Sequence, residues 1–425
     1  MQNPKTSNPW SWVPSLYFAE AIPYVVVMTL APALYKARGI SNDDMAFYTS
    51  LLYWPWVLKF LWSPLVDMFR TKRLWTVCTQ FAIATGLAVA AWSMNLPNWF
   101  MISIVILWFM AFASATHDIA ADGFYMLGLH EKHEQAAFVG VRSTFYRLAT
   151  IFAGGVMMNL AGDLTKSTKD PAYAWTVTFA ALAAIFFILC AYHAFKLPRP
   201  VTDHAVAESD NKMKEFIHTF VAFFKKPNIL LILGFILTFR LGESQLLKLA
   251  IPFMMDPTSK GGLAMSLSQV GLAYSTIGII GLTLGGLLGG YLISRHGLKR
   301  MLWPMVFAVH VPDLIFVYLA TALPDNLYLI SACLAVEQFG YGFGFTAMVL
   351  YMIMIADGEH KTAHYAICTG LMALGMMVPG MYSGRIQEYL GYQNFFIYVC
   401  VMTIPAFLMA ALVKIPPEFG KKAAV

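Results

Sequence analysis

Apolar runs of 18 or more residues recur along the whole 425-residue chain, and each is long enough to cross a lipid bilayer as an α-helix. Only 12% of the residues are charged, whereas a soluble domain has about 25%. Backbone polar groups inside a bilayer must be satisfied within each span, and the alternating pattern of a membrane β-barrel is absent. The sequence therefore predicts an all-α membrane protein. Its first span is full length and others follow, as expected of a membrane segment rather than a cleaved signal peptide.

Twelve spans are predicted, in two groups of six separated by a polar stretch. The predicted domains are an N-terminal six-helix bundle at 1–195, a cytoplasmic linker at 196–227 and a C-terminal six-helix bundle at 228–425. The spans are 14–36, 45–66, 74–94, 98–128, 136–161, 173–195, 228–254, 266–293, 301–322, 326–355, 363–384 and 394–414.

The distribution of Lys and Arg predicts the orientation. If the N-terminus is cytoplasmic, 18 of these residues lie in cytoplasmic segments, 6 on the opposite side and 5 within spans. Because cytoplasmic loops of membrane proteins are enriched in Lys and Arg, both termini are expected in the cytoplasm.

The two halves resemble each other weakly. SPLVDMFRTKR (63–73) follows the second span and YLISRHGLKR (291–300) follows the eighth, so both halves have a basic turn in the same place. Two six-helix halves with such turns match the architecture of the major facilitator fold. In the first turn we expect Asp67, Lys72 and Arg73 to act in conformational gating. In the eighth span, glycines 281, 285 and 289 have the spacing of close helix packing.

Polar residues within spans are the candidate functional residues, because charges inside a bilayer usually face a cavity or a partner. Asp118 and Asp122 are four residues apart on one face of the fourth span, with His117 beside them. Two carboxylates on one stripe repel when both are ionised, which favours a proton carrier. The alternative is that one acid pairs with an Arg of a neighbouring helix and holds the bundle together.

Other spans contribute further charges. Arg142 and Arg147 on the fifth span are natural partners for these acids, and Arg147 could instead bind an anionic substrate group. In the seventh span, Arg240 and Glu243 are three residues apart and can pair on one face. The acids Glu20 and Glu337 lie near aromatic residues, namely Tyr17 and Tyr24 for the first and Tyr341 for the second. Acids beside aromatic rings suit sugars and other amphipathic ligands, although aromatic residues are common in membrane bundles.

Several protein classes are disfavoured. The five cysteines are scattered without paired spacing, so neither a disulfide framework nor a metal site is predicted. We find no nucleotide-binding motif, expect no cofactor and expect no nucleic-acid partner. A membrane-embedded enzyme would need a His or Cys nucleophile system, and a sensor would usually carry an added soluble domain. Both remain weaker alternatives to a transporter.

Particular motifs resemble a known family. KFLWSPLVD (59–67) and SATHDIAADG (114–123) are similar to signatures of the muropeptide permease (AmpG-type) family, the peptide/acetyl-coenzyme A transporter branch of the major facilitator superfamily. YRL at 146–148, LGE at 241–243 and Glu337 match the same family. The resemblance covers nearly the whole chain.

This resemblance implies proton-driven import of peptidoglycan fragments, built of N-acetylglucosamine and anhydro-N-acetylmuramic acid with or without peptide, across the bacterial inner membrane. By position it implies roles for Asp118, Asp122, Arg147, Glu243 and Glu337, with Arg240 at a basic position. Glu20 and His117 replace uncharged polar residues of the family, so a smaller amino sugar or sugar acid is an alternative substrate.

The resulting hypothesis is a monomeric secondary transporter that works by alternating access. Asp118, Asp122 and Glu20 would couple protons. The residues expected to bind substrate are Arg147, Arg240, Glu243, Glu337, Tyr17, Tyr24, Tyr341 and His117. The main rival is a sugar or organic-anion carrier of the same fold.

Overall fold

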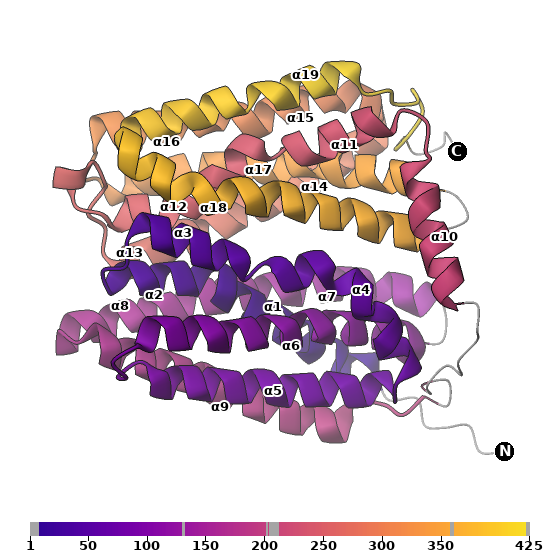
Figure 1. Ribbon diagram of the computed structural model, residues 1–425, viewed down its shortest axis with the longest axis horizontal. Coiled ribbons are helices and arrows are strands. Elements are labelled where there is room, and N and C mark those ends of the chain that lie inside the picture. Colours follow the sequence, from indigo (N-terminus) through magenta and orange to yellow (C-terminus); the bar gives the residue numbers. More distant parts are fainter. Residues whose placement is uncertain (1–7, 130–131, 201–202, 204–211, 358–360, 422–425) are drawn as a thin grey trace. The chain divides into compact units, whose positions relative to one another are not determined.

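The computed structural model describes residues 8–129, 132–200, 203, 212–357 and 361–421, and within these ranges the regular structure is entirely helical. The prediction of an all-α protein is thereby confirmed. Figure 1 shows long helices lying side by side within each part of the chain. Of the expected linker at 196–227, residues 201–202 and 204–211 lie outside the described residues.

The chain divides into two compact units. The N-terminal unit contains residues 1–38 and 52–208, and the C-terminal unit contains residues 39–51 and 209–425. The short segment 39–51, which comes early in the chain, thus belongs to the C-terminal unit. The domain boundaries expected from the sequence stay a prediction.

In the N-terminal unit, helix α5 packs against α6 and α9, while α1 packs against α6 and α7. A π-helical segment, Val26–Leu30, joins α1 to α2, and a second one, Phe152–Val156, joins α7 to α8. The helices are α1 (Val13–Val25), α2 (Ala31–Ala37), α4 (Trp54–Met68), α5 (Lys72–Ser93), α6 (Trp99–Gly128), α7 (Lys132–Ile151), α8 (Met157–Thr168) and α9 (Pro171–Lys196).

In the C-terminal unit, α17 packs against α14 and α15, while α18 packs against α3, α12 and α16. A π-helical segment, Gly271–Gly278, leads into α14. The helices are α3 (Asn42–Leu51), α10 (Lys212–Phe224), α11 (Ile229–Thr238), α12 (Leu241–Met255), α13 (Leu267–Val270), α14 (Ile279–His296), α15 (Leu298–His310), α16 (Leu314–Ala322), α17 (Leu327–Ala356), α18 (Lys361–Met402) and α19 (Ile404–Leu412).

Polar residues in short loops begin the long helices. The Asp170 carboxylate accepts hydrogen bonds from the N–H groups of Ala172 and Tyr173 (2.9 and 3.1 Å) at the start of α9, and Pro171 occupies the first helical position. Asn326 caps α17 in the same way. These caps satisfy backbone donors that the helix itself leaves free.

The predicted second span, 45–66, is wrong as a single helix. Helix α3 ends at Leu51 and α4 begins at Trp54, with Pro55 in the first turn of α4. Proline lacks the N–H that would continue the helix and clashes with the preceding turn, so the chain bends before it. At the other end of the chain, Gly391 (φ 73°) interrupts the long helix α18 between the last two predicted spans.

Within the described residues, ten helical segments are long and apolar enough to cross a membrane. The broken second span is not among them, and the last two predicted spans are counted as one segment, His364–Leu412. The count of twelve therefore stays a prediction, while the membrane-spanning class of the protein is confirmed.

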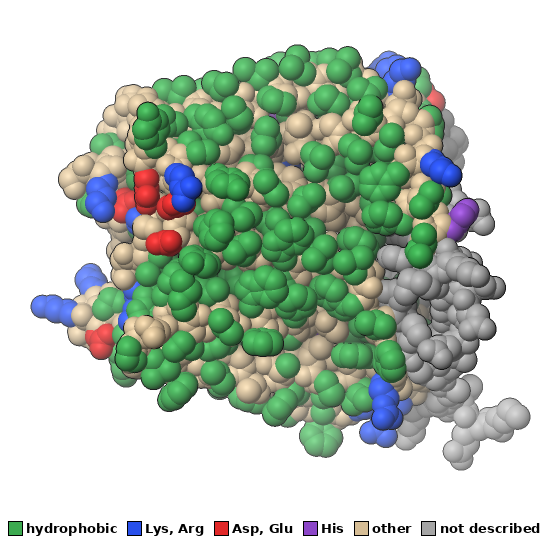
Figure 2. Space-filling view, in the orientation of Figure 1, with side chains coloured by type: hydrophobic (Ala, Val, Ile, Leu, Met, Phe, Trp, Pro, Cys, Tyr) green, Lys and Arg blue, Asp and Glu red, His purple; other side chains and the backbone are tan. Residues whose placement is uncertain are grey.

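Large hydrophobic side chains lie on the outside of these helices. Phe109 on α6 is 74% exposed and Leu287 on α14 is 69% exposed. On the face drawn in Figure 2, hydrophobic side chains cover most of the surface, and Lys and Arg side chains lie toward the ends of the helices. This distribution suits helices whose outer faces contact lipid.

The close packing predicted from the glycine spacing is confirmed between α14 and α17. A side chain at Gly285 would collide with the backbone of Phe339 and Phe343, whereas one at Gly290 would meet no atom within 4 Å. Gly342 on α17 faces the backbone of Leu282 in the same way. The two helix backbones are therefore nearly in contact, as small residues allow in membranes.

We predict opposite effects for two alanine substitutions on α14. Gly285→Ala should destabilise the protein by about 1–3 kcal/mol, because the added methyl group overpacks the helix crossing. Gly290→Ala should be neutral or stabilising by up to about 1 kcal/mol, because alanine favours helix and space is available. Thermal unfolding of the purified variants in detergent measures both. Equal melting temperatures would contradict the packing described above.

Candidate functional site

A buried polar cluster of the C-terminal unit forms where the seventh predicted span is interrupted. Helix α11 ends at Thr238 and α12 begins at Leu241, and Arg240 lies in the break with φ −110° and ψ 18°. Its side chain is 6% exposed and that of Glu243 is 1% exposed. The break thus lies within a segment, Ile229–Met255, that is long enough to cross a membrane.

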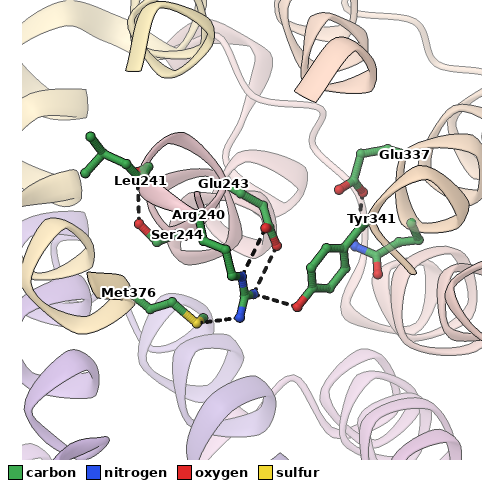
Figure 3. A network of polar contacts seen from close by, with 8 residues as sticks. Arg240, Leu241, Glu243, Ser244, Glu337, Tyr341 and Met376 are labelled. Carbon is green, nitrogen blue, oxygen red and sulfur yellow. Dashed lines mark hydrogen bonds and ion pairs between the residues drawn. The ribbon is translucent and has the colours of Figure 1, made fainter. Parts of the chain in front are cut away.

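Arg240 is held by three side chains from different helices, as Figure 3 shows. Its guanidinium donates two hydrogen bonds to the carboxylate of Glu243, both 3.1 Å long. It also donates to the hydroxyl of Tyr341 on α17 (2.5 Å) and to the sulfur of Met376 on α18 (2.6 Å). A bidentate pair of this kind fixes the arginine in one orientation.

Glu337 lies one helical turn before Tyr341 on α17 (Figure 3) and is 1% exposed. Its carboxylate accepts a hydrogen bond of 3.0 Å from the side-chain amide of Gln338. The structure therefore brings together four of the predicted residues, Arg240, Glu243, Glu337 and Tyr341.

A second polar cluster lies in the N-terminal unit, around the acids of α6. The amino group of Lys59 on α4 lies 3.6 Å from the carboxylate of Asp118. Arg142 on α7 pairs with Asp122 at 3.0 Å, and the hydroxyl of Tyr17 on α1 donates to the same carboxylate oxygen at 3.0 Å. The expected alternative of a bundle-holding ion pair thus describes Asp122 well.

Aromatic rings surround the Asp122 pair. The guanidinium of Arg142 lies 4.5 Å from the ring centre of Tyr17 and 5.4 Å from that of Tyr125. Cation–π contacts of this kind add to the ion pair in holding the arginine. Side-chain exposure separates the two acids, since Asp122 is 45% exposed and Asp118 is 14% exposed.

Glu20 on α1 is the third acid of this cluster. It is 8% exposed, and its Oε2 atom has no hydrogen-bond partner within the described part of the chain. It interacts electrostatically with both acids of α6 and with both cations, Lys59 and Arg142. Three carboxylates thus lie close to Lys59 and Arg142.

His117 turns away from these acids. It is 1% exposed, and its Nε2 atom lies 2.9 Å from the side-chain amide of Gln80 on α5. The same amide contacts His193 on α9, which in turn contacts the hydroxyl of Ser15, each at 2.9 Å. Adjacent residues of a helix project about 100° apart, so His117 faces α5 when Asp118 faces α4. Its substrate-binding role stays a prediction that this packing does not favour.

Two further predicted substrate residues lie at the edges of the N-terminal cluster. Tyr24 packs edge-on against Trp56, with ring centres 5.4 Å apart. Arg147 lies on α7, five residues after Arg142, and is half-buried. Of the two arginines that the sequence offered as partners for the acids, Arg142 pairs with Asp122.

The basic turn after α4 is bound to the end of α9. The Arg73 guanidinium donates to the carbonyl groups of Ala194 and Leu197, and the Asp203 carboxylate accepts from the backbone N–H groups of Lys72 (2.7 Å) and Arg73 (3.0 Å). A cation at the carbonyl end of a helix is stabilising. The side chain of Asp67, the third expected gating residue, lies outside the described part.

Sequence reasoning missed the roles of two charged residues. Lys59 is one of the five Lys and Arg residues within predicted spans, and a lysine inside an apolar run indicates a buried partner. Lys248 on α12 contacts the hydroxyl of Thr49 at 3.2 Å. It lies one helical turn after Ser244 on the same face of α12, a relation that the sequence spacing shows.

A match to a family model over nearly the whole chain identifies the family of this protein. Residues 15–249 and 240–424 both match the model of the Major Facilitator Superfamily. The chain belongs to this superfamily. It is therefore a membrane transporter and not an enzyme, and it acts on a small-molecule substrate.

Individual proteins are similar to nearly the whole chain. The anhydromuropeptide permease of Escherichia coli K12 is 24% identical over 416 residues, which cover 96% of this chain and 80% of that protein. An uncharacterized protein of Haemophilus influenzae is 24% identical over 405 residues, covering 92% of this chain and 91% of that one. The resemblance to the AmpG-type family is thereby confirmed.

Solved structures share the fold. The nucleoside transporter NupG superposes with a TM-score of 0.70 at 17% identity, covering 95% of this chain and 98% of that one. A D-xylose–proton symporter superposes with a TM-score of 0.69 at 13% identity, covering 97% and 98%. The expected major facilitator fold is thus confirmed.

Removing one partner of the buried Arg240–Glu243 pair should be strongly destabilising. Glu243→Leu leaves the guanidinium without its carboxylate, and breaking a buried pair costs about 3–5 kcal/mol. Glu418→Gln is the matched control, because Glu418 also pairs with a cation three residues away but is 80% exposed. It should change stability by less than about 1 kcal/mol. Thermal unfolding in detergent measures both.

The double variant Arg240→Met/Glu243→Leu separates structure from function. Replacing both charges by apolar groups should restore most of the stability. If the cluster serves only to hold helices together, transport will recover as well. If the cluster contacts substrate, the protein will fold but will not transport.

Proposed function

We propose that the protein is a proton-coupled importer of peptidoglycan-derived muropeptides or anhydro-amino sugars, working by alternating access in a bacterial inner membrane. Asp118 is the leading proton site, with Asp122 and Glu20 as its neighbours. The observation that carries this proposal is the group of three carboxylates around Lys59 and Arg142, in which buried Glu20 keeps one carboxyl oxygen without a hydrogen-bond partner among the described residues.

The charge balance supports coupling in the following way. Lys59 pairs with Asp118 and Arg142 with Asp122, whereas the Oε2 atom of the buried Glu20 has no hydrogen-bond partner among the described residues. An uncompensated charge in a low-dielectric site is costly, so one acid binds a proton. The amino group of Lys59 and the carboxylate of Asp118 are 3.6 Å apart, which is long for a hydrogen bond. Protonation of the carboxylate can therefore break this contact.

The substrate class rests on the relatives and on the polar residues of the C-terminal unit. One relative is named for anhydromuropeptides, which combine sugar rings with carboxylates. The C-terminal cluster offers charged groups beside an aromatic ring, as such a ligand requires, and it consists of Arg240, Glu243, Glu337 and Tyr341. Arg147, Tyr17, Tyr24 and His117 complete the proposed substrate-binding set.

The remaining parts of the proposal concern orientation and gating. Both termini lie in the cytoplasm, as the Lys and Arg distribution predicts. The turn that contains Asp67, Lys72 and Arg73 takes part in gating, and the protein works as a monomer.

A second candidate is a carrier of small organic anions. It is favoured by Lys248, a cation for which the described residues provide a hydroxyl contact at 3.2 Å but no ion pair. Its ammonium group has three donors and suits a carboxylate of a substrate. Uptake of neutral amino sugars, sugar acids and muropeptides, compared side by side, separates the two candidates.

Asp118→Asn should abolish proton-driven accumulation. In proteoliposomes with an imposed pH gradient, one coupled proton supports about tenfold accumulation of labelled anhydromuropeptide for a gradient of roughly one pH unit. The neutral asparagine cannot exchange the proton, so the variant should only equilibrate the substrate. Asp325→Asn, in an exposed loop, is the control and should accumulate like the unchanged protein.

The outcomes are distinct. Accumulation that persists in Asp118→Asn removes the coupling assignment, and accumulation that survives a proton ionophore removes coupling altogether. If no muropeptide enters but a sugar acid does, the substrate assignment fails and the second candidate stands.

A further inference from the structure

The C-terminal unit holds a further buried carboxyl group, that of Asp313, which makes no hydrogen bond to the Arg240 cluster. Helix α15 ends at His310, a short 3-10 turn covers Val311–Asp313, and α16 begins at Leu314. Pro312 explains the break, because it cannot continue the preceding helix. Asp313 therefore lies near the middle of the 25-residue segment Leu298–Ala322, which is long enough to cross a membrane.

Asp313 is buried without a polar partner. It is 1% exposed, and within the described part of the chain neither carboxyl oxygen has a hydrogen-bond partner. Its position precedes the first residue of α16, but its side chain does not cap that helix. Most buried polar groups in proteins are hydrogen-bonded, so a carboxyl group with two unpartnered oxygens requires an explanation.

The packing of α17 shows which groups face Asp313. A side chain at Gly340 would meet Ala308 and Pro312, and one at Gly344 would meet Met305 and Val309. The two helices therefore run in opposite directions in close contact. One turn before Gly340, Glu337 comes level with the turn that contains Asp313.

The charged and titratable groups around Asp313 come from each element packed against it. It interacts electrostatically with Glu337 on α17 and Glu243 on α12, and with the thiol of Cys400 on α18. His310, at the end of α15, has its ring 5.6 Å from Phe239 and 5.5 Å from Phe407, and neither ring nitrogen has a partner among the described residues. Arg240, the cation next to Glu243, forms an ion pair with that residue.

The charge balance decides the state of Asp313. Three acids lie together, and the bidentate pair with Arg240 offsets only Glu243. An ionised Asp313 would stand beside an acid, with no hydrogen-bond donor to its carboxylate among the described residues, at a depth where a charge costs several kcal/mol. A proton on the carboxyl group removes both the repulsion and the cost of desolvation.

We propose that Asp313 is a second proton-binding site, which holds a proton in the described conformation and exchanges it with Glu337 or water during the transport cycle. The transferred species is a single proton between two carboxyl groups or between a carboxyl group and water, and no other bond changes. This inference extends the coupling proposed for Asp118 to the other unit, but proton binding at Asp313 does not depend on the identity of the substrate.

Infrared difference spectroscopy tests the proton directly. On the purified full-length protein in lipid, titration with alkali should convert a protonated carboxyl C=O band to carboxylate bands. Asp313→Asn should lack one component of that band, whereas Asp325→Asn should retain it. Asparagine has the shape of a neutral aspartic acid, so Asp313→Asn should fold with an unchanged melting temperature. Asp313→Glu, which keeps the carboxyl group, should retain the band if the longer side chain fits.

A transport assay is the second test of the proton site at Asp313. With labelled anhydromuropeptide, Asp313→Asn should keep substrate exchange at equilibrium and lose pH-driven accumulation. An infrared band identical in the Asp313→Asn and unchanged proteins would overturn the proposal. So would full accumulation by Asp313→Asn, or loss of the protonated band on addition of Na⁺ at constant pH, which would assign the site to a metal cation.

The result is separable from that of the first coupling proposal. If Asp118→Asn accumulates substrate normally but Asp313→Asn does not, the assignment at Asp118 fails and the one at Asp313 holds. The converse result leaves coupling in the N-terminal unit and removes it from Asp313.

Discussion

Moving an ionised side chain to the centre of a membrane helix costs about 2.5–3.5 kcal/mol on insertion scales, so each charge within a span must be offset. Both units meet this requirement by bringing helices from distant parts of the sequence around a few charges. Arg240 takes its carboxylate from its own helix but its other contacts from α17 and α18. Asp118 and Asp122 take their cations from α4 and α7. The polar contacts thus tie together helices whose mutual packing is otherwise apolar.

The sequence predicted which residues are polar within spans, but it predicted their partners only in part. Spacing along one helix was enough for Arg240 and Glu243, because residues three apart share a face. The contact between Lys59 and Asp118 was not predictable, since the fourth span is apolar on all sides and its pattern does not define which face meets α4. The same ambiguity explains His117, which is adjacent to Asp118 in the sequence yet packs toward Gln80.

Helix breaks were harder to predict than spans. Prolines at positions 55 and 312 indicate the two breaks in α3–α4 and α15–α16, yet a hydropathy window averages across them. The break at Arg240 contains no proline, so nothing local distinguishes it from a continuous helix. Two of the breaks in the C-terminal unit contain a buried ionisable residue, Arg240 in one and Asp313 in the other.

Buried groups whose hydrogen bonds are all satisfied keep their charge, whereas groups with an unpartnered oxygen can change their charge. Arg240 and Glu243 neutralise each other through two hydrogen bonds, so a change in proton concentration shifts their state little. Glu20 and Asp313 each keep a carboxyl oxygen without a partner among the described residues, so their charge depends on what reaches them. A transporter needs both kinds, because a group can couple two conformations only if its interaction energy differs between them. The unsatisfied acids are therefore better candidates for coupling than the well-paired ones, although the paired ones form the more conspicuous clusters.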